Sequence, residues 1–259
     1  MMHISVWRLG SLTALLMVAL LSTGCVTRVE GTTQPATREE RVAAQLALAR
    51  AHIENEDWAS ARPPLRRAID IDRRTPEAYA MFAMLYEAEG DDDEAESYYR
   101  RGLRFNRNHS MTLNNYGIFL FNQGRYDEAR RYLQRAVQDS SYVGRGQAFM
   151  NLGLTELALE NYDEAEAALR RSVRLNANQP EAHLELSYLA LNAGKLAEAR
   201  HYYDNYLQLA NQTPRSLWIG IQLYEALNDQ DRVSSYALQL RNLHPGSDEH
   251  QKWREMQGR

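Results

Sequence analysis

Hydrophobic and polar residues follow three different patterns along the chain. Residues 9–21 are apolar except for one glycine, one serine and one threonine. Residues 26–38 are rich in threonine and lack apolar periodicity, which is typical of a flexible tether. Beyond residue 41, apolar positions recur at helical spacing, as in Leu113, Tyr116 and Leu120. The pattern predicts an apolar leader, a tether and a helical body.

The helical body is built on an internal repeat. Short segments that end in a small residue align with one another, and their final residues are separated by 34, 34, 36, 34 and 34 positions. In four of the six segments, glycine or asparagine stands five residues earlier, where it can adopt the left-handed conformation that ends a helix. The final residues are Ala61, Ala95, Ala129, Ala165, Ala199 and Val233. A period of 34 is that of tetratricopeptide (TPR) repeats, each of which is a pair of helices.

We therefore expect an all-α fold, a right-handed superhelical solenoid of six TPR helix pairs closed by a C-terminal capping helix. The predicted parts are a signal peptide at 1–24, a tether at 25–41, the repeats at 42–247 and a capping helix and tail at 248–259. The six repeats are predicted at 42–75, 76–109, 110–145, 146–179, 180–213 and 214–247.

Two irregularities interrupt the repeat. Pro63 and Pro64 lie inside the second helix of the first repeat, where proline removes a hydrogen bond and clashes with the preceding turn. We expect that helix to start late or to bend. The third repeat has two extra residues, which we place in its exit loop at 140–146.

Composition narrows the class of function. The 259 residues carry a net charge of −4, whereas a protein that binds nucleic acid through phosphate contacts normally has a basic excess. Seven histidines are scattered without metal-ligand spacing, and no phosphate loop or nucleophile motif occurs. The acidic run at 91–94 is explained by helix capping and the helix dipole. We predict a binding protein rather than an enzyme, with no catalytic residue, metal, nucleic acid or small-molecule substrate.

The single cysteine stands in a segment that looks like a bacterial lipobox. Leu21-Ser22-Thr23-Gly24-Cys25 follows an arginine and an apolar core, the arrangement of a secretory signal. The resemblance implies N-acyl and S-diacylglycerol lipid on Cys25, no other cofactor, and outer-membrane lipid as a partner through this anchor. Because valine rather than aspartate follows the cysteine, it also implies the outer membrane, facing the periplasm. A tether of this length averages roughly 20 Å from end to end.

TPR arrays bind partners mainly along the surface formed by their first helices. The corresponding positions in this chain are mostly apolar, and we expect them to hold an apolar or amphipathic segment of a partner. For any single residue, packing between neighbouring helices is an equally good interpretation. The predicted groove residues are Leu46, Arg50, Ile53, Met84, Ile118, Phe121, Met150, Leu154, Leu157, Leu184, Tyr188 and Trp218.

Nearly the whole chain resembles the type IV pilus biogenesis lipoproteins of the PilF/PilW family. The likeness lies in the lipobox, the tether, the six repeats and segments such as 113–117, 124–129 and 150–153. Members of this family are pilotins. The resemblance implies that the chain binds the secretin subunit, promotes its outer-membrane localisation and multimerisation, and so supports twitching motility. It further implies a contribution from the N-terminal repeats, including Leu46, Ile53 and Met84.

A second binding function stays open. A TPR lipoprotein could instead be a scaffold for β-barrel insertion or for cell-wall enzymes. The envelope protein that co-purifies with the chain would distinguish these two functions.

Overall fold

The computed structural model describes residues 35–258, which contain helices, turns and loops but no strand. The helices belong to one compact unit that begins at Arg38. Their bounds are α2 (Arg38–Glu54), α3 (Trp58–Ile71), α4 (Pro76–Glu89), α5 (Asp92–Phe105), α6 (Ser110–Asn122), α7 (Tyr126–Ala136), α8 (Arg145–Ala158), α9 (Tyr162–Leu175), α10 (Pro180–Asn192), α11 (Leu196–Leu209), α12 (Pro214–Ala226), α13 (Gln230–Leu243) and α14 (Asp248–Gln257).

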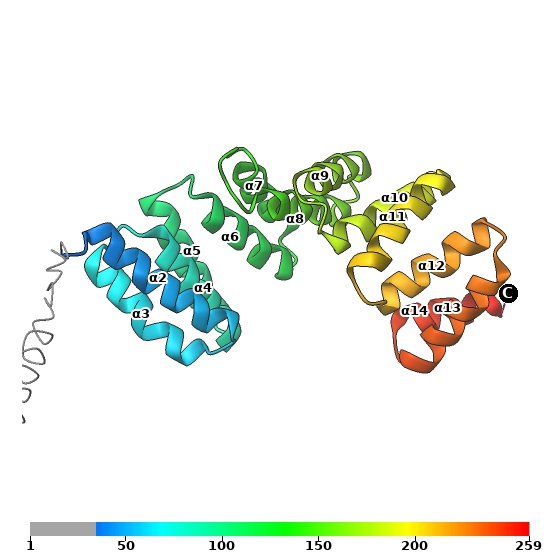
Figure 1. The fold of residues 1–259 in the computed structure, drawn as a ribbon, viewed down its shortest axis with the longest axis horizontal. Coiled ribbons are helices and arrows are strands. Elements are labelled where there is room, and N and C mark those ends of the chain that lie inside the picture. The colour runs from blue at the N-terminus through cyan, green and yellow to red at the C-terminus, as the bar shows by residue number, and fades with distance from the viewer. Residues whose placement is uncertain (1–34, 259) are drawn as a thin grey trace, which may run out of the picture. The chain divides into compact units, whose positions relative to one another are not determined.

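The helices pair in chain order as six hairpins, from α2/α3 to α12/α13 (Figure 1). The second helix of each hairpin also contacts the first helix of the next one. The last helix, α14, lies against α12 and α13 and so covers the final hairpin. The predicted all-α solenoid of TPR helix pairs is confirmed.

Local sequence determines where the helices begin and end. Three first helices start with proline, which lacks the N–H that a first turn leaves unpaired. The side chains of Asp57 and Asp91 cap α3 and α5 by accepting a hydrogen bond from a backbone N–H of the first turn. Three first helices are followed by a glycine with positive φ, a conformation that costs other residues energy: Gly90 (76°), Gly124 (72°) and Gly194 (69°).

The small residue that defines the repeat lies in the contact between paired helices. Five of these residues have an exposed fraction of 0%, namely Ala61, Ala95, Ala129, Ala165 and Ala199. In the α8/α9 hairpin the first helix also contributes a glycine. A Cβ atom on Gly153 would lie only 2.6 Å from Cγ of Leu169. The sequence period therefore marks the places where two helices approach most closely.

Two local predictions need correction. Helix α2 begins at Arg38, so residues 38–41 are helical rather than part of the tether. Helix α3 does not start late, because it begins at Trp58 and contains both prolines. Its Asp57 cap secures the first turn, which explains how the helix begins before Pro63.

The irregular third repeat has a shorter helix as well as a longer loop. Helix α7 has 11 residues, whereas α3, α5, α9, α11 and α13 have 14 each. The connection to α8 spans 137–144, compared with the short 72–75 connection after α3. Arg145 Nε donates to the carbonyl oxygen of Val137 at 2.7 Å, which satisfies an acceptor left free where α7 ends early.

The close contact at Gly153 gives a first prediction. Gly153→Val should lower the unfolding free energy by about 1 to 3 kcal/mol, because the new side chain overlaps Leu169. The thermal midpoint should then fall by about 2 to 4 °C for each kcal/mol. Circular dichroism of the purified chain measures this midpoint.

Gly246→Val is the matched control, because no atom lies within 4 Å of a Cβ built at Gly246. It should change stability by no more than about 0.5 kcal/mol. If the two substitutions lowered stability equally, the close contact between α8 and α9 would not be the reason for glycine at residue 153.

Candidate functional site

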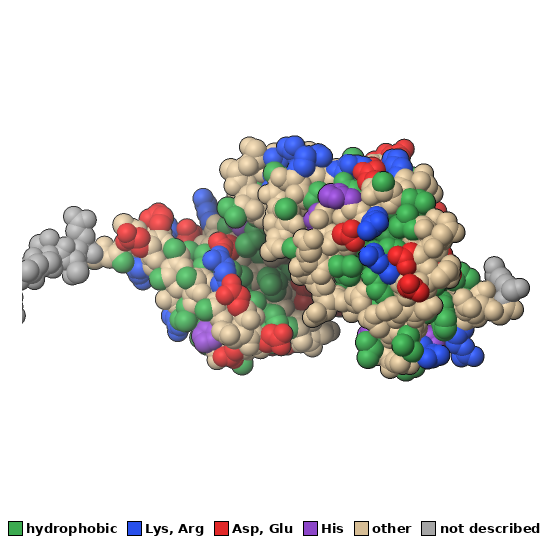
Figure 2. Space-filling model, turned by 45° about the vertical axis from the view of Figure 1, so that its right-hand side comes forward, with side chains coloured by type: hydrophobic (Ala, Val, Ile, Leu, Met, Phe, Trp, Pro, Cys, Tyr) green, Lys and Arg blue, Asp and Glu red, His purple; other side chains and the backbone are tan. Residues whose placement is uncertain are grey.

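The first helices of successive hairpins form one continuous surface. Helix α2 contacts α4, α4 contacts α6, and the series continues through α8 and α10 to α12. All the predicted groove residues belong to these six helices. We call this the first-helix surface. Figure 2 shows the molecule hollowed near its middle, with hydrophobic side chains inside the hollow.

Three predicted groove residues are buried in the core. Leu46, Met150 and Leu184 have exposed fractions of 7%, 6% and 6%. They belong to three different hydrophobic clusters, in which they pack against neighbouring helices. In this structure they support the first-helix surface from beneath rather than forming its exposed face.

Three other predicted residues come together around a recess. Ile118 and Phe121 from α6 and Leu154 from α8 line a cavity of about 150 Å³. Leu133 from α7 also lines it, and Asn122, Asn151 and Thr155 complete the lining. No charged side chain lines this recess. The arrangement can therefore accept an apolar side chain and offers amide groups for hydrogen bonds nearby. We call it the α6/α8 recess.

Amide side chains connect first helices beside the recess. Asn151 Nδ2 donates to Asn114 Oδ1 at 2.9 Å, which joins α8 to α6. Asn114 Nδ2 in turn donates to Asn115 Oδ1 at 3.1 Å, and Asn115 Nδ2 lies 3.5 Å from Met84 Sδ on α4. These contacts hold three first helices in a defined arrangement.

The predicted groove residues do not include these asparagines. Asn114 precedes Met150 by 36 residues, the length of the third repeat, so the two residues occupy equivalent positions. The spacing could therefore have identified Asn114. Asn114 is polar, so it falls outside the apolar pattern that defines the predicted groove.

The remaining predicted residues are spread along the surface. Arg50 is exposed and forms an ion pair with Glu77 across α2 and α4. Tyr188 lies under the guanidinium of Arg215, which is 5.2 Å from the ring centroid. Arg215 also bonds both carboxylate oxygens of Glu185, at 2.7 and 2.6 Å, so this part of the surface is charged. Ile53, Met84, Leu157 and Trp218 are each half-buried.

A half-buried carboxyl group lies on α4. Glu87 accepts a hydrogen bond from the hydroxyl of Tyr99, which is itself almost fully buried. Burial raises the pKa of the Glu87 carboxyl, although the hydrogen bond from Tyr99 acts in the opposite direction. The ionised form of Glu87 therefore destabilises the folded chain relative to the protonated form.

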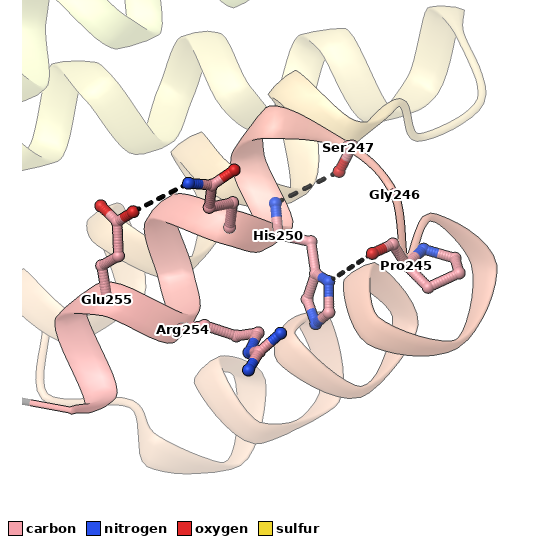
Figure 3. A pocket seen from close by; sticks show the side chains of 7 residues that line it. Pro245, Gly246, Ser247, His250, Arg254 and Glu255 are labelled. Carbon is pink, nitrogen blue, oxygen red and sulfur yellow. Dashed lines mark hydrogen bonds between the residues drawn. The ribbon is translucent and has the colours of Figure 1, made fainter.

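A larger hollow lies beside α14 and the turn that precedes it (Figure 3). It has a volume of about 480 Å³ and is lined by residues of the turn and of α14. Ser247 accepts a hydrogen bond from the backbone N–H of His250 at 3.2 Å, and the His250 ring lies 2.8 Å from the carbonyl oxygen of Pro245. These polar groups are used to cap α14, so we assign this hollow a structural role.

Two kinds of feature were not found in the described part of the chain. Residues 35–258 contain no group of three or more His, Cys, Asp or Glu side chains that could hold a metal ion. Within the same residues, no helix has the length and apolar character needed to cross a bilayer. The predicted lipidation site, Cys25, lies outside the described residues.

Comparisons with known proteins agree with the repeat architecture. Tetratricopeptide repeat models match residues 76–109, 109–178 and 150–214. The fold and the first-helix surface define the chain as a TPR solenoid, a class whose repeats form extended binding surfaces.

Relatives specify the family. The type IV pilus assembly protein PilF of Pseudomonas aeruginosa is 37% identical over 248 residues, which cover 94% of this chain and 97% of the relative. A solved structure of P. aeruginosa PilF has a TM-score of 0.80 and 36% identity, covering 85% of this chain and 99% of that one. The crystal structure of PilW, described as a widely conserved type IV pilus biogenesis factor, has a TM-score of 0.68 and 26% identity, covering 82% and 97% of the two chains. The chain belongs to the PilF family of type IV pilus biogenesis TPR proteins.

The raised pKa of Glu87 gives a second prediction. Glu87→Gln should stabilise the chain near neutral pH, because glutamine cannot ionise and can still accept the hydrogen bond from Tyr99. The gain should disappear at about pH 3, more than one unit below the ordinary pKa of glutamate, where the wild-type carboxyl is protonated in both states. Thermal unfolding at both pH values measures the difference.

Glu54→Gln is the control, because Glu54 is exposed at the end of α2. It should have little effect at either pH. A Glu87→Gln gain that persists unchanged in acid would show that the effect does not come from ionisation.

Proposed function

We propose that this chain is an outer-membrane pilotin that binds the secretin subunit of the type IV pilus and promotes its multimerisation. It acts by binding rather than by catalysis. Membership of the PilF family supports the role in pilus biogenesis. The single observation that carries the binding role is the uncharged α6/α8 recess on the first-helix surface.

The chemistry of the recess suits an apolar segment of a partner. Its apolar walls would hold a bulky side chain, while Asn122 at its rim is exposed and can hydrogen-bond a peptide backbone. We infer that this contact protects the secretin subunit from premature association until the ring forms. Covering an apolar segment on each subunit would provide that protection.

Delivery to the membrane depends on the lipid. We propose that Cys25 carries the N-acyl and S-diacylglycerol groups and anchors the chain in the outer membrane, facing the periplasm. Each buried methylene contributes about 0.8 kcal/mol, so several acyl chains would make the attachment effectively permanent. Binding the secretin subunit would then bring that subunit to the same membrane.

The recess gives a third prediction. Ile118→Ala combined with Phe121→Ala should weaken binding of the purified secretin subunit by at least about tenfold, because residues that anchor an interface typically contribute more than 1 kcal/mol each. A titration followed by light scattering or interferometry measures the dissociation constant. The thermal midpoint is recorded in parallel to verify folding.

Leu238→Ala is the matched control for this experiment. Leu238 has an exposed fraction of 48% and lies on α13, a second helix outside the first-helix surface. Its substitution should leave binding unchanged. Normal binding by the folded recess variant would eliminate the recess as the binding site.

The anchor gives a fourth prediction, which concerns cells. Heat-resistant secretin multimers should be lost when the gene is deleted and should be mislocalised with Cys25→Ser. Membrane fractionation and immunoblotting of wild-type, deletion and Cys25→Ser strains measure both effects. Unchanged multimers in all three strains would favour the second candidate function, a scaffold for β-barrel insertion or cell-wall enzymes.

A further inference from the structure

In the middle of the helical array, from the second to the fifth hairpin, the two edges carry opposite charge. Second helices end and first helices begin at one edge, which we call the basic edge. Its segments 104–110, 135–145 and 174–181 contain five arginines and two acidic residues. At the opposite edge, which we call the acidic edge, the segments at 89–94, 124–128 and 160–164 contain ten acidic residues and one arginine. The dipoles of the second helices favour arginine where these helices end and acidic residues where they begin, so charge alone does not indicate a ligand.

Exposed apolar side chains distinguish the basic edge further. Eight large hydrophobic side chains are exposed among the described residues, and five of them lie at this edge. Val143, in the loop between α7 and α8, has an exposed fraction of 101%, and Leu243 has one of 67%. Leu243 is the last residue of the second helix α13. The other three exposed residues, Phe105, Leu175 and Leu209, are likewise the last residues of second helices. Neither capping nor helix dipoles explain a row of exposed apolar groups.

Several arginines at this edge are available to an anion. Arg104, Arg107 and Arg174 form no ion pair with another described residue. The nearby carboxylate of Asp139 is occupied by hydrogen bonds from the hydroxyls of Ser110 and Ser141, at 2.7 and 2.6 Å. The second helices α5 and α7 also enclose a recess of about 330 Å³ with no acidic lining residue. It is lined by Arg100, Leu103, Arg104, Arg107, Tyr132 and Arg135.

The chain enters the helical array at this same edge. Arg38, the first residue of α2, donates from Nε to the carbonyl oxygen of Ile71 at 2.9 Å and pairs with Asp72 at 3.0 Å. The start of α2 is therefore fixed beside the end of α3. Twelve residues separate Cys25 from Arg38. Even fully extended, they could span no more than roughly 40 Å.

We propose that the basic edge lies against the anionic phospholipid surface of the membrane in which the chain is anchored. The exposed apolar side chains would enter the headgroup region, and the arginines would attract lipid phosphates. The choice of membrane rests on the lipidation proposed above. A lipid surface fits better than an acidic peptide, because the apolar groups extend from α5 to α13 along the edge where the chain enters.

Vesicle binding tests this surface without the lipid anchor. The mature chain, residues 25–259 with Cys25→Ser, keeps every residue that the structure describes. It should sediment with vesicles of phosphatidylethanolamine and phosphatidylglycerol, and raising the salt concentration should weaken this binding. Vesicles of phosphatidylcholine alone should bind it less.

A matched pair of variants locates the contact. Arg104→Gln with Arg107→Gln should lower the partition coefficient by about 30-fold, given the usual contribution of two basic side chains near an anionic surface. Lys195→Gln with Arg200→Gln removes the same charge at the acidic edge and should have little effect. Equal losses for the two pairs would show only a dependence on net charge and would overturn the proposal.

A fluorescent probe tests insertion directly. Because Cys25 is the only cysteine, a Val143→Cys change in the Cys25→Ser chain gives one labelling site. An environment-sensitive dye there should shift to shorter wavelength on anionic vesicles. The same dye at Tyr162→Cys should not, although Tyr162 is also exposed at 52% and begins α9 at the acidic edge.

The outcomes separate this proposal from the lipidation proposal. The proposal that the basic edge faces the membrane would be overturned if the unlipidated chain did not bind vesicles. It would also be overturned if the dye shifted equally at both positions. Vesicle binding that is unaffected by loss of Arg104 and Arg107 would likewise overturn the proposal. It would indicate that these arginines bind an acidic protein partner instead. Lipidation itself is tested by incorporation of labelled palmitate, which Cys25→Ser should abolish, and neither result depends on the other.

Discussion

The close approach of two helices within each hairpin is the constraint on which the rest of the structure depends. Five of the repeats place a fully buried alanine at this contact, and Gly117 and Gly153 meet leucines of the facing helices. A larger side chain there would separate the pair and tilt the first helix relative to its neighbours. The first helices contact one another in series because each is packed closely against its second helix, so the first-helix surface depends on small residues at the contact between paired helices.

Because the same contact recurs in each hairpin, the sequence could predict the fold from one period. Alanines at spacing 34 and glycines before them indicated both the helices and their turns, and the helical array confirms them. The period could not predict that α3 would begin before its prolines, since that depends on the Asp57 cap. Nor could it predict how α7 would adjust to two extra residues. Helix α7 is shorter than the other second helices, and the carbonyl oxygen of Val137 accepts a hydrogen bond from the Arg145 side chain.

The groove was harder to predict than the fold, for a physical reason. Leu184 and Tyr188 lie one turn apart on α10, yet the first is buried and the second half-buried. A repeat pattern identifies the side of the helix that faces the array. It does not specify how far adjacent repeats rotate, and that rotation decides which side chain is covered by the next first helix. The recess adjoins the junction between the third and fourth hairpins, where the period is 36 rather than 34.

Charge and position together allow both proposed contacts to form at once. Ile118 lies eight residues after the start of α6, which places it about 12 Å along the helix from the basic edge. Phe121 and Asn122 lie further still, toward the acidic edge. An anionic surface would attract one edge and repel the other, so it would hold the array with the recess away from the lipid. A chain with a net charge of −4 can present such a basic face because its acidic residues are concentrated where the second helices begin. The proposed membrane contact, at the ends of second helices and in the loops that follow them, and the proposed partner contact in the recess would therefore lie at different places in the array and need not compete.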